Sequence, residues 1–159
     1  MMKFDRKSIR LKDWDYSQGS YFVTICIEKW RGRPCAYPKI EMAKIENGYS
    51  YLNDFGEIVA EEWIRLKDNF GIDLDEYMIM PDHIHGIIGF NNRATTTLGD
   101  IIGAFKSKTS VAYIYGVNNL SWPRFEKRLW HRNYYERVIR NYRELLRIRN
   151  YIKQNPKKY

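Results

Sequence analysis

Apolar positions along the chain fall into short runs typical of β-strands and longer stretches with a helical period. Residues 20–27 (SYFVTICI) are β-branched and aromatic, which predicts a central strand. Residues 76–80 and 83–90 predict two more strands around a turn at Pro81-Asp82, and residues 134–139 predict a short fourth strand. Glycines, prolines and Asn47 within residues 31–50 predict a loop with a short irregular hairpin.

Three helices are predicted by apolar stripes with a period near 3.6 residues. The first covers residues 53–70 and ends at Gly71, and the second runs from Thr97 to Gly116. Asn141 caps the third helix, which ends at Pro156. The order β, α, β, β, α, β, α predicts a single α+β domain over residues 1–159, with one antiparallel sheet and helices packed mainly on one face.

The chain is basic and rich in aromatic residues. Its net charge is +8 and its aromatic fraction is 16%. Lysine and arginine neutralise phosphates while aromatic faces stack on unpaired bases, so the composition suits a single-stranded nucleic-acid partner. The alternative is a basic surface around an aromatic core, and composition alone does not decide between the two. As a group, the candidate DNA-backbone contacts are Lys106, Lys108, Arg128, Arg132, Arg137 and Arg140. For each residue taken singly, the alternative is an ordinary solvent-facing charge.

The sequence also bears on cellular location. It contains no apolar stretch of about eighteen residues, which argues against a membrane span. The N-terminal lead-in, MMKFDRKSIRLKDWD, is charged throughout and does not resemble a signal peptide, so we expect a cytoplasmic protein. Cys26 and Cys35 are expected to be ordinary free thiols.

The segment MPDHIHGII, residues 80–88, places two histidines in an apolar run. Side chains alternate between the faces of a strand, so His83 and His85 are expected to project from the same side. Two adjacent imidazoles form half of a metal site. The alternative is a pair of strand histidines that make ordinary hydrogen bonds.

The last predicted helix offers groups that could complete such a site. Tyr151 and Asn155 are four residues apart and therefore share a helix face. A tyrosine phenol can act as a nucleophile, and an asparagine carbonyl oxygen can complete the coordination of a divalent ion. Gln154 offers the same amide group as Asn155, and Tyr135 and Tyr142 are the reserve candidates for the nucleophile.

Several blocks of the sequence resemble a known family. His83-Ile84-His85 resembles the histidine-hydrophobe-histidine motif of HUH endonucleases. The segment from Trp14 to Cys26, LGDIIGAFKS, LWHRNYYERVIRN and YIKQNP resemble, in this order, the REP-associated tyrosine transposases, relatives of single-tyrosine insertion-sequence transposases. The resemblance extends from about residue 10 to residue 158.

This resemblance implies a ferredoxin-like or RRM-like sheet and a metal-dependent enzyme that cleaves and joins single-stranded DNA at or near hairpins or palindromic repeats. Tyr151 would attack the phosphate to give a 5′-phosphotyrosine, with His83, His85 and Asn155 as ligands of Mg²⁺ or Mn²⁺. It permits a monomer or a homodimer. The alternatives are a non-catalytic single-stranded nucleic-acid-binding module with an RRM-like sheet and, less favoured by size, a replication nickase.

Overall fold

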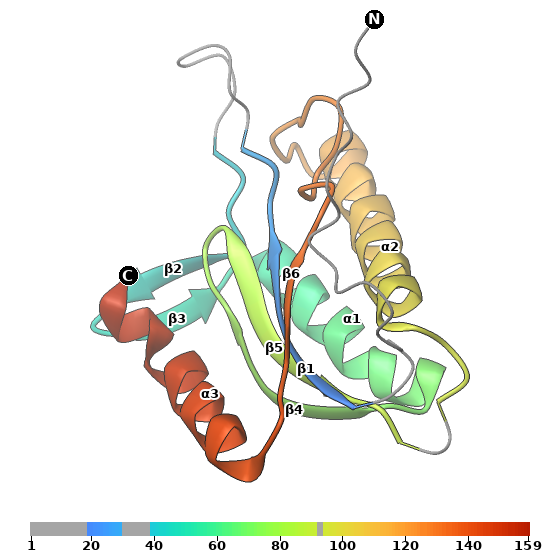
Figure 1. Ribbon diagram of the computed structural model, residues 1–159. Coiled ribbons are helices and arrows are strands. Elements are labelled where there is room, and N and C mark those ends of the chain that lie inside the picture. The colour runs from blue at the N-terminus through green and yellow to red at the C-terminus, as the bar shows by residue number, and fades with distance from the viewer. Residues whose placement is uncertain (1–18, 30–38, 92–93) are drawn as a thin grey trace, which may run out of the picture.

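A four-stranded antiparallel sheet forms the centre of the structure, in the spatial order β4-β5-β1-β6 (Figure 1). The strands are β1 (Ser20–Cys26), β4 (Asp73–Ile79), β5 (His83–Gly89) and β6 (Tyr135–Val138). The helices are α1 (Asp54–Phe70), α2 (Leu98–Asn119) and α3 (Tyr142–Gln154), and a 3₁₀ turn, η1 (Asn155–Lys158), follows α3. The α+β fold with an antiparallel sheet, predicted from the sequence, is confirmed.

This computed structural model describes residues 19–29, 39–91 and 94–159. The charged N-terminal lead-in, the start of the Trp14–Cys26 block and Cys35 lie outside the described residues. Within the described ranges, no helix has both the length and the apolar character required to cross a bilayer.

One face of the sheet packs against α1 and α2 and forms the main core. Tyr21, Val23 and Ile25 of β1 point into it and are fully buried. Gly86 of β5 leaves room for the indole of Trp63 from α1, since a Cβ at position 86 would lie only 2.2 Å from that ring. The alternation of β1 therefore assigns every second residue to this core, as the apolar pattern predicts.

The third helix, α3, lies on the opposite face of the sheet (Figure 1). Its Ile148 and Ile152 are buried against Ile87 of β5, with Phe22 and Met78 around them. The prediction that helices pack mainly on one face holds for α1 and α2, while α3 covers the other side. A helical stripe shows that a helix is buried on one side but does not show which sheet face receives it.

A separate hairpin connects β1 to α1. It consists of β2 (Ala43–Glu46) and β3 (Tyr49–Leu52), which pair antiparallel. Asn47 and Gly48 both have positive φ, 51° and 77°, as the two central residues of a tight hairpin turn require. The Ser50 hydroxyl donates to the carbonyl of Ile79 at 2.6 Å and ties this hairpin to the end of β4.

The predicted end of the second helix at Gly116 is wrong, because α2 continues to Asn119. Gly116 is needed for close packing instead: a Cβ there would lie 2.0 Å from the ring of Trp122. Its carbonyl accepts hydrogen bonds from the backbone N–H groups of Leu120 and Trp122, and these bonds turn the chain back along the helix.

Candidate catalytic and metal-binding site

The two histidines of β5 project from the sheet face that carries α3. The Nε2 atoms of His83 and His85 are 3.1 Å apart, and their ring centroids are 4.5 Å apart. Residues two positions apart on a strand share a face, so the strand itself brings the imidazoles together as predicted. Both Nε2 atoms thus converge on one point at the surface of the sheet.

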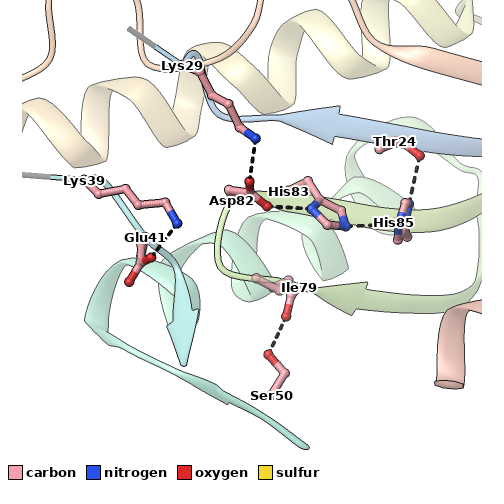
Figure 2. Close-up of polar contacts among 9 residues, drawn as sticks. All are labelled: Thr24, Lys29, Lys39, Glu41, Ser50, Ile79, Asp82, His83 and His85. Atoms are coloured by element: carbon pink, nitrogen blue, oxygen red, sulfur yellow. Dashed lines mark hydrogen bonds and ion pairs between the residues drawn. The ribbon is translucent and has the colours of Figure 1, made fainter. Parts of the chain in front are cut away.

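The Nδ1 atom of each imidazole ring is within hydrogen-bonding distance of a neighbouring side chain (Figure 2). Nδ1 of His83 lies 2.8 Å from Oδ1 of Asp82, and Nδ1 of His85 lies 2.8 Å from the hydroxyl of Thr24 on β1. Lys29 forms an ion pair with the other oxygen of Asp82 at 3.2 Å. Carboxylates and hydroxyls in this position orient imidazoles that bind metals through their remaining nitrogen.

The protonation of these groups suits a cation site. Burial raises the pKa of Asp82, but hydrogen bonds with His83 and Lys29 outweigh it and leave this pKa below its ordinary value. Ionised Asp82 can only accept a hydrogen bond, so the contact with Asp82 favours the tautomer of His83 that has its proton on Nδ1 and leaves Nε2 as the ligand atom. Burial, and then the nearby His83, lower the pKa of His85 to about 4, so that this imidazole is neutral at neutral pH.

Tyr151 of α3 packs its ring against His85, on the sheet face that carries the histidines. Its ring centroid is 5.5 Å from that of His85 and 6.0 Å from that of Phe22, which itself stacks on His85 at 5.3 Å. Tyr151 is 44% exposed, so it remains open to solvent in part. The ammonium of Lys158 lies 5.9 Å from the same ring and places positive charge beside it.

Asn155 and Gln154 stand in different environments at the end of α3. Asn155 keeps a right-handed helical conformation, with φ −56° and ψ −44°, although it precedes Pro156, and it is half-buried. Gln154 is exposed and donates to the side chain of Asn150 at 3.2 Å. Among the described residues, neither amide forms a hydrogen bond with His83 or His85. The choice of third ligand stays a prediction.

Ion pairs hold α3 against the edge strand β4. The guanidinium of Arg149 donates to both carboxylate oxygens of Asp75, at 2.8 and 2.6 Å. Lys153 forms a second ion pair, at 3.2 Å, with Glu76. Together with the buried Ile148 and Ile152, these contacts set the position of Tyr151 above the histidines.

The predicted DNA contacts do not form one uniform group. Lys106 of α2 donates to the backbone carbonyls of His131, Arg132 and Asn133, at 2.8, 3.5 and 3.2 Å. Arg137 forms an ion pair with Glu144 at 2.6 Å, and much of its side chain remains exposed. The other four are exposed, three of them in the segment that leads into β6 and α3: Lys108, Arg128, Arg132 and Arg140.

The reserve tyrosines lie farther from the histidines. Tyr135 shares the sheet face of His85, but β1 separates the two strands. Tyr142 is exposed at the first position of α3, more than two turns from Tyr151. Of the three tyrosines considered, Tyr151 has its ring against an imidazole.

Sequence reasoning missed Asp82 and Thr24 as partners of the histidines. Asp82 precedes His83 directly, and Thr24 is a polar residue within an apolar strand, so each gave a weak signal. Within the ranges that the structure describes, no group of three or more His, Cys, Asp or Glu side chains could hold a metal ion.

The sheet, its convergent histidines and the tyrosine helix above them define an α+β domain with its candidate chemistry on one sheet face. The family model described as "Transposase IS200 like" matches residues 43–155. The chain belongs to this family of IS200-like transposases, and its function is transposase-like. The resemblance to REP-associated tyrosine transposases is confirmed at the level of family and fold.

Individual relatives agree with this assignment. An uncharacterized protein of Haemophilus influenzae is 36% identical over an alignment of 176 positions, which covers 95% of this chain and 88% of that protein. A REP-associated tyrosine transposase, solved bound to a REP hairpin, superposes with a TM-score of 0.65 at 16% identity, over 94% of this chain and 73% of that one. A proposed transposase of Deinococcus radiodurans superposes with a TM-score of 0.53 at 14% sequence identity. That superposition covers 91% of this chain and 95% of the other.

Proposed function

We propose that this protein cleaves and rejoins single-stranded DNA at or beside hairpins, with Tyr151 as the nucleophile and a divalent ion held by His83, His85 and Asn155. The observation that carries the proposal is the contact between the Tyr151 and His85 rings, whose centroids are 5.5 Å apart although the residues are distant in the sequence. Family membership supports the reaction class, and the REP hairpin bound by the structural relative supports the substrate.

The donor set fits the ion. With Nδ1 of each imidazole directed to Asp82 or Thr24, the two Nε2 atoms can both present lone pairs to one cation. The Thr24 hydroxyl can donate or accept, so it can take the His85 proton on Nδ1 when Nε2 is needed as a ligand. When bound, Mg²⁺ or Mn²⁺ would polarise the scissile phosphate and orient it.

The chain's own residues supply the covalent step. The Tyr151 oxygen attacks phosphorus as the phenol loses its proton to solvent, and the bond from phosphorus to the 3′ oxygen breaks. The electron pair stays on that oxygen, which takes up a proton and leaves as a 3′-OH, while the 5′-phosphate remains on Tyr151. Attack by another 3′-OH reverses the step and joins the strands.

Replacement of Tyr151 by phenylalanine tests the proposal. Wild-type protein, Mn²⁺ and labelled hairpins with single-stranded flanks, drawn from palindromic repeats beside the gene, should give a covalent protein–DNA adduct that survives denaturing electrophoresis. Tyr151→Phe should abolish the adduct, since it removes only the attacking oxygen, and should leave binding intact.

Tyr142→Phe is the matched control, because Tyr142 is an exposed tyrosine on the same helix and should keep full adduct formation. An adduct in Tyr151→Phe would overturn the assignment of the nucleophile. Tight hairpin binding by the wild type with no adduct would instead identify a non-catalytic binding module.

A further inference from the structure

The sheet face that carries the histidines is covered unevenly. The helix α3 lies over β4 and β5, where Ile148 and Ile152 pack on Ile87. On the other side of the histidines, the edge strand β6 presents two exposed side chains on this face, Tyr135 and Arg137. The tyrosine side chain is 63% exposed.

Strand register connects these exposed residues to the histidines. Thr24 of β1 lies opposite His85 on one side and opposite Tyr135 on the other. Residues directly opposite in antiparallel strands project from the same face, and the 2.8 Å contact between Thr24 and His85 shows which face this is. Tyr135 therefore stands two strand spacings, about 10 Å, from His85 on the same surface.

Arg137 occupies the next position on this face. It lies opposite Phe22, whose ring contacts both His85 and Tyr151. One nitrogen of its guanidinium pairs with Glu144, and the ion pair keeps the mostly exposed side chain beside α3. An exposed aromatic ring and a cation thus stand side by side, continuous with the candidate site.

We propose that Tyr135 is a base-stacking residue that holds the unpaired nucleotide next to the scissile phosphate, with Arg137 contacting the DNA backbone beside it. The proposal rests on the proposed function, because it takes the phosphate to lie at His83 and His85. An exposed tyrosine offers a flat face to any base, and stacking of this kind combines with nearby basic groups in proteins that bind single strands. Tyr135 acts in binding and forms no bond to phosphorus.

The chain provides a matched control for this role. Tyr49 on the β2–β3 hairpin is 64% exposed, almost the same as Tyr135. It belongs to a different, two-stranded sheet and has no register with the histidine strand. A general effect of exposed tyrosines on DNA binding would appear equally at both positions.

Affinity measurements test the proposal with a DNA hairpin that carries oligo-dT flanks, in EDTA so that no cleavage competes. Tyr135→Ala should weaken binding about tenfold, within the range of roughly 5- to 150-fold expected for loss of one stacked base. Tyr135→Phe keeps the ring and should stay within about twofold of wild type, as should Tyr49→Ala. Unchanged binding by Tyr135→Ala, or an equal loss in Tyr49→Ala, would overturn the proposal.

Photocrosslinking locates the contact. In this experiment, 5-iodouracil replaces thymine at each flank position in turn. A crosslink to Tyr135 should form from a single position, the one next to the phosphate that is cleaved when Mn²⁺ is supplied. Crosslinks confined to other residues would refute the stacking role.

Cleavage assays separate this proposal from the proposed function. Tyr49→Ala should form the covalent adduct normally, because Tyr49 lies in the separate two-stranded sheet. If Tyr135→Phe forms no adduct while Tyr151→Phe does, Tyr135 is the nucleophile and the stacking role is wrong. Absence of an adduct in the wild type would count against the proposed cleavage chemistry. The affinity of Tyr135→Ala in EDTA does not depend on cleavage and therefore tests the stacking role separately.

Discussion

At the scale of single residues, the candidate site is built from neighbours that restrict the two imidazoles. Asp82 and Thr24 each occupy the Nδ1 side of one ring, at 2.8 Å. The sequence alone predicts that His83 and His85 share a face, because this follows from strand periodicity. It does not predict Thr24, because that contact depends on the register between β1 and β5.

Removal of the Asp82 carboxylate should weaken metal binding. Asp82→Ala leaves His83 free to rotate and to change tautomer, so the affinity for Mn²⁺ should fall about 10- to 100-fold. Titration of the protein with Mn²⁺, with free ion measured by electron paramagnetic resonance, gives this affinity without any DNA.

Glu41→Ala is the control, because Glu41 forms an ion pair with Lys39 and does not contact the histidines (Figure 2). Its affinity for Mn²⁺ should equal that of wild type. Equal affinities in Asp82→Ala and Glu41→Ala would show that His83 needs no orienting partner.

At the scale of elements, the two faces of the sheet differ in how firmly their helices are held. The α1/α2 face has a large buried cluster, whereas α3 rests on Ile87, Ile148 and Ile152 with a few half-buried neighbours. The bidentate ion pair between Asp75 and Arg149 adds to this small apolar contact between α3 and the sheet. Since Tyr151 belongs to α3, this ion pair bears on the position of the candidate nucleophile.

Asp75→Asn should loosen α3 while the rest of the fold stays intact. Amide hydrogen exchange within residues 142–154 should accelerate roughly two- to fivefold, a modest effect because solvent screens a partly exposed pair. Exchange in β1 and β5 should not change. Glu62→Gln removes an ion pair of similar length on α1, with Arg65, and should leave α3 exchange unaltered.

The same ion pair gives a pH dependence of definite sign. The hydrogen bonds from Arg149, which outweigh burial, hold the pKa of Asp75 below its ordinary value of 3.8. A lowered pKa means that the stabilisation is present above the ordinary value and is lost as the pH falls through the lowered one. Exchange of α3 in wild type should therefore approach that of Asp75→Asn only below about pH 4, and acceleration near pH 6 would contradict this assignment.

Much of the element order was predictable from the sequence. The stripes and caps of all three helices are local signals, as is the Asn47-Gly48 turn of the hairpin. The strand order and the side on which α3 packs depend on contacts between distant segments, which periodicity does not encode. The error at Gly116 has the same origin, because the partner that requires this glycine is Trp122 beyond the helix.

At the scale of the whole molecule, the basic residues behind the net charge of +8 are not equally available to bind DNA phosphates. The Lys106 ammonium is shared among three carbonyls of the segment that leads into β6. Lys108, two residues along the same helix, is exposed. The sequence predicted both as DNA contacts because carbonyl partners are invisible in a sequence.

Lys106→Ala and Lys108→Ala should change different properties, the first thermal stability and the second the salt dependence of DNA binding. The first should lower Tm by about 2–4 °C, the shift expected for roughly 1 kcal/mol in a chain of this size, because it removes charged hydrogen bonds. The second should leave Tm unchanged and reduce the slope of log affinity for hairpin DNA against log salt by about 1. Thermal unfolding and binding titrations at several salt concentrations measure both. A change of slope with unchanged Tm in Lys106→Ala would restore Lys106 as a phosphate contact.

The alternation of β1 has a consequence for how such a protein can change during evolution. Tyr21, Val23 and Ile25 belong to the core, whereas Phe22 and Thr24 face the histidines. Successive positions of β1 are therefore under different constraints: one side chain must fit the core, and the next must fit the surface beside the histidines. Substitutions can revise the site without disturbing the interior, but an insertion or deletion of one residue would exchange the two sets and damage both at once.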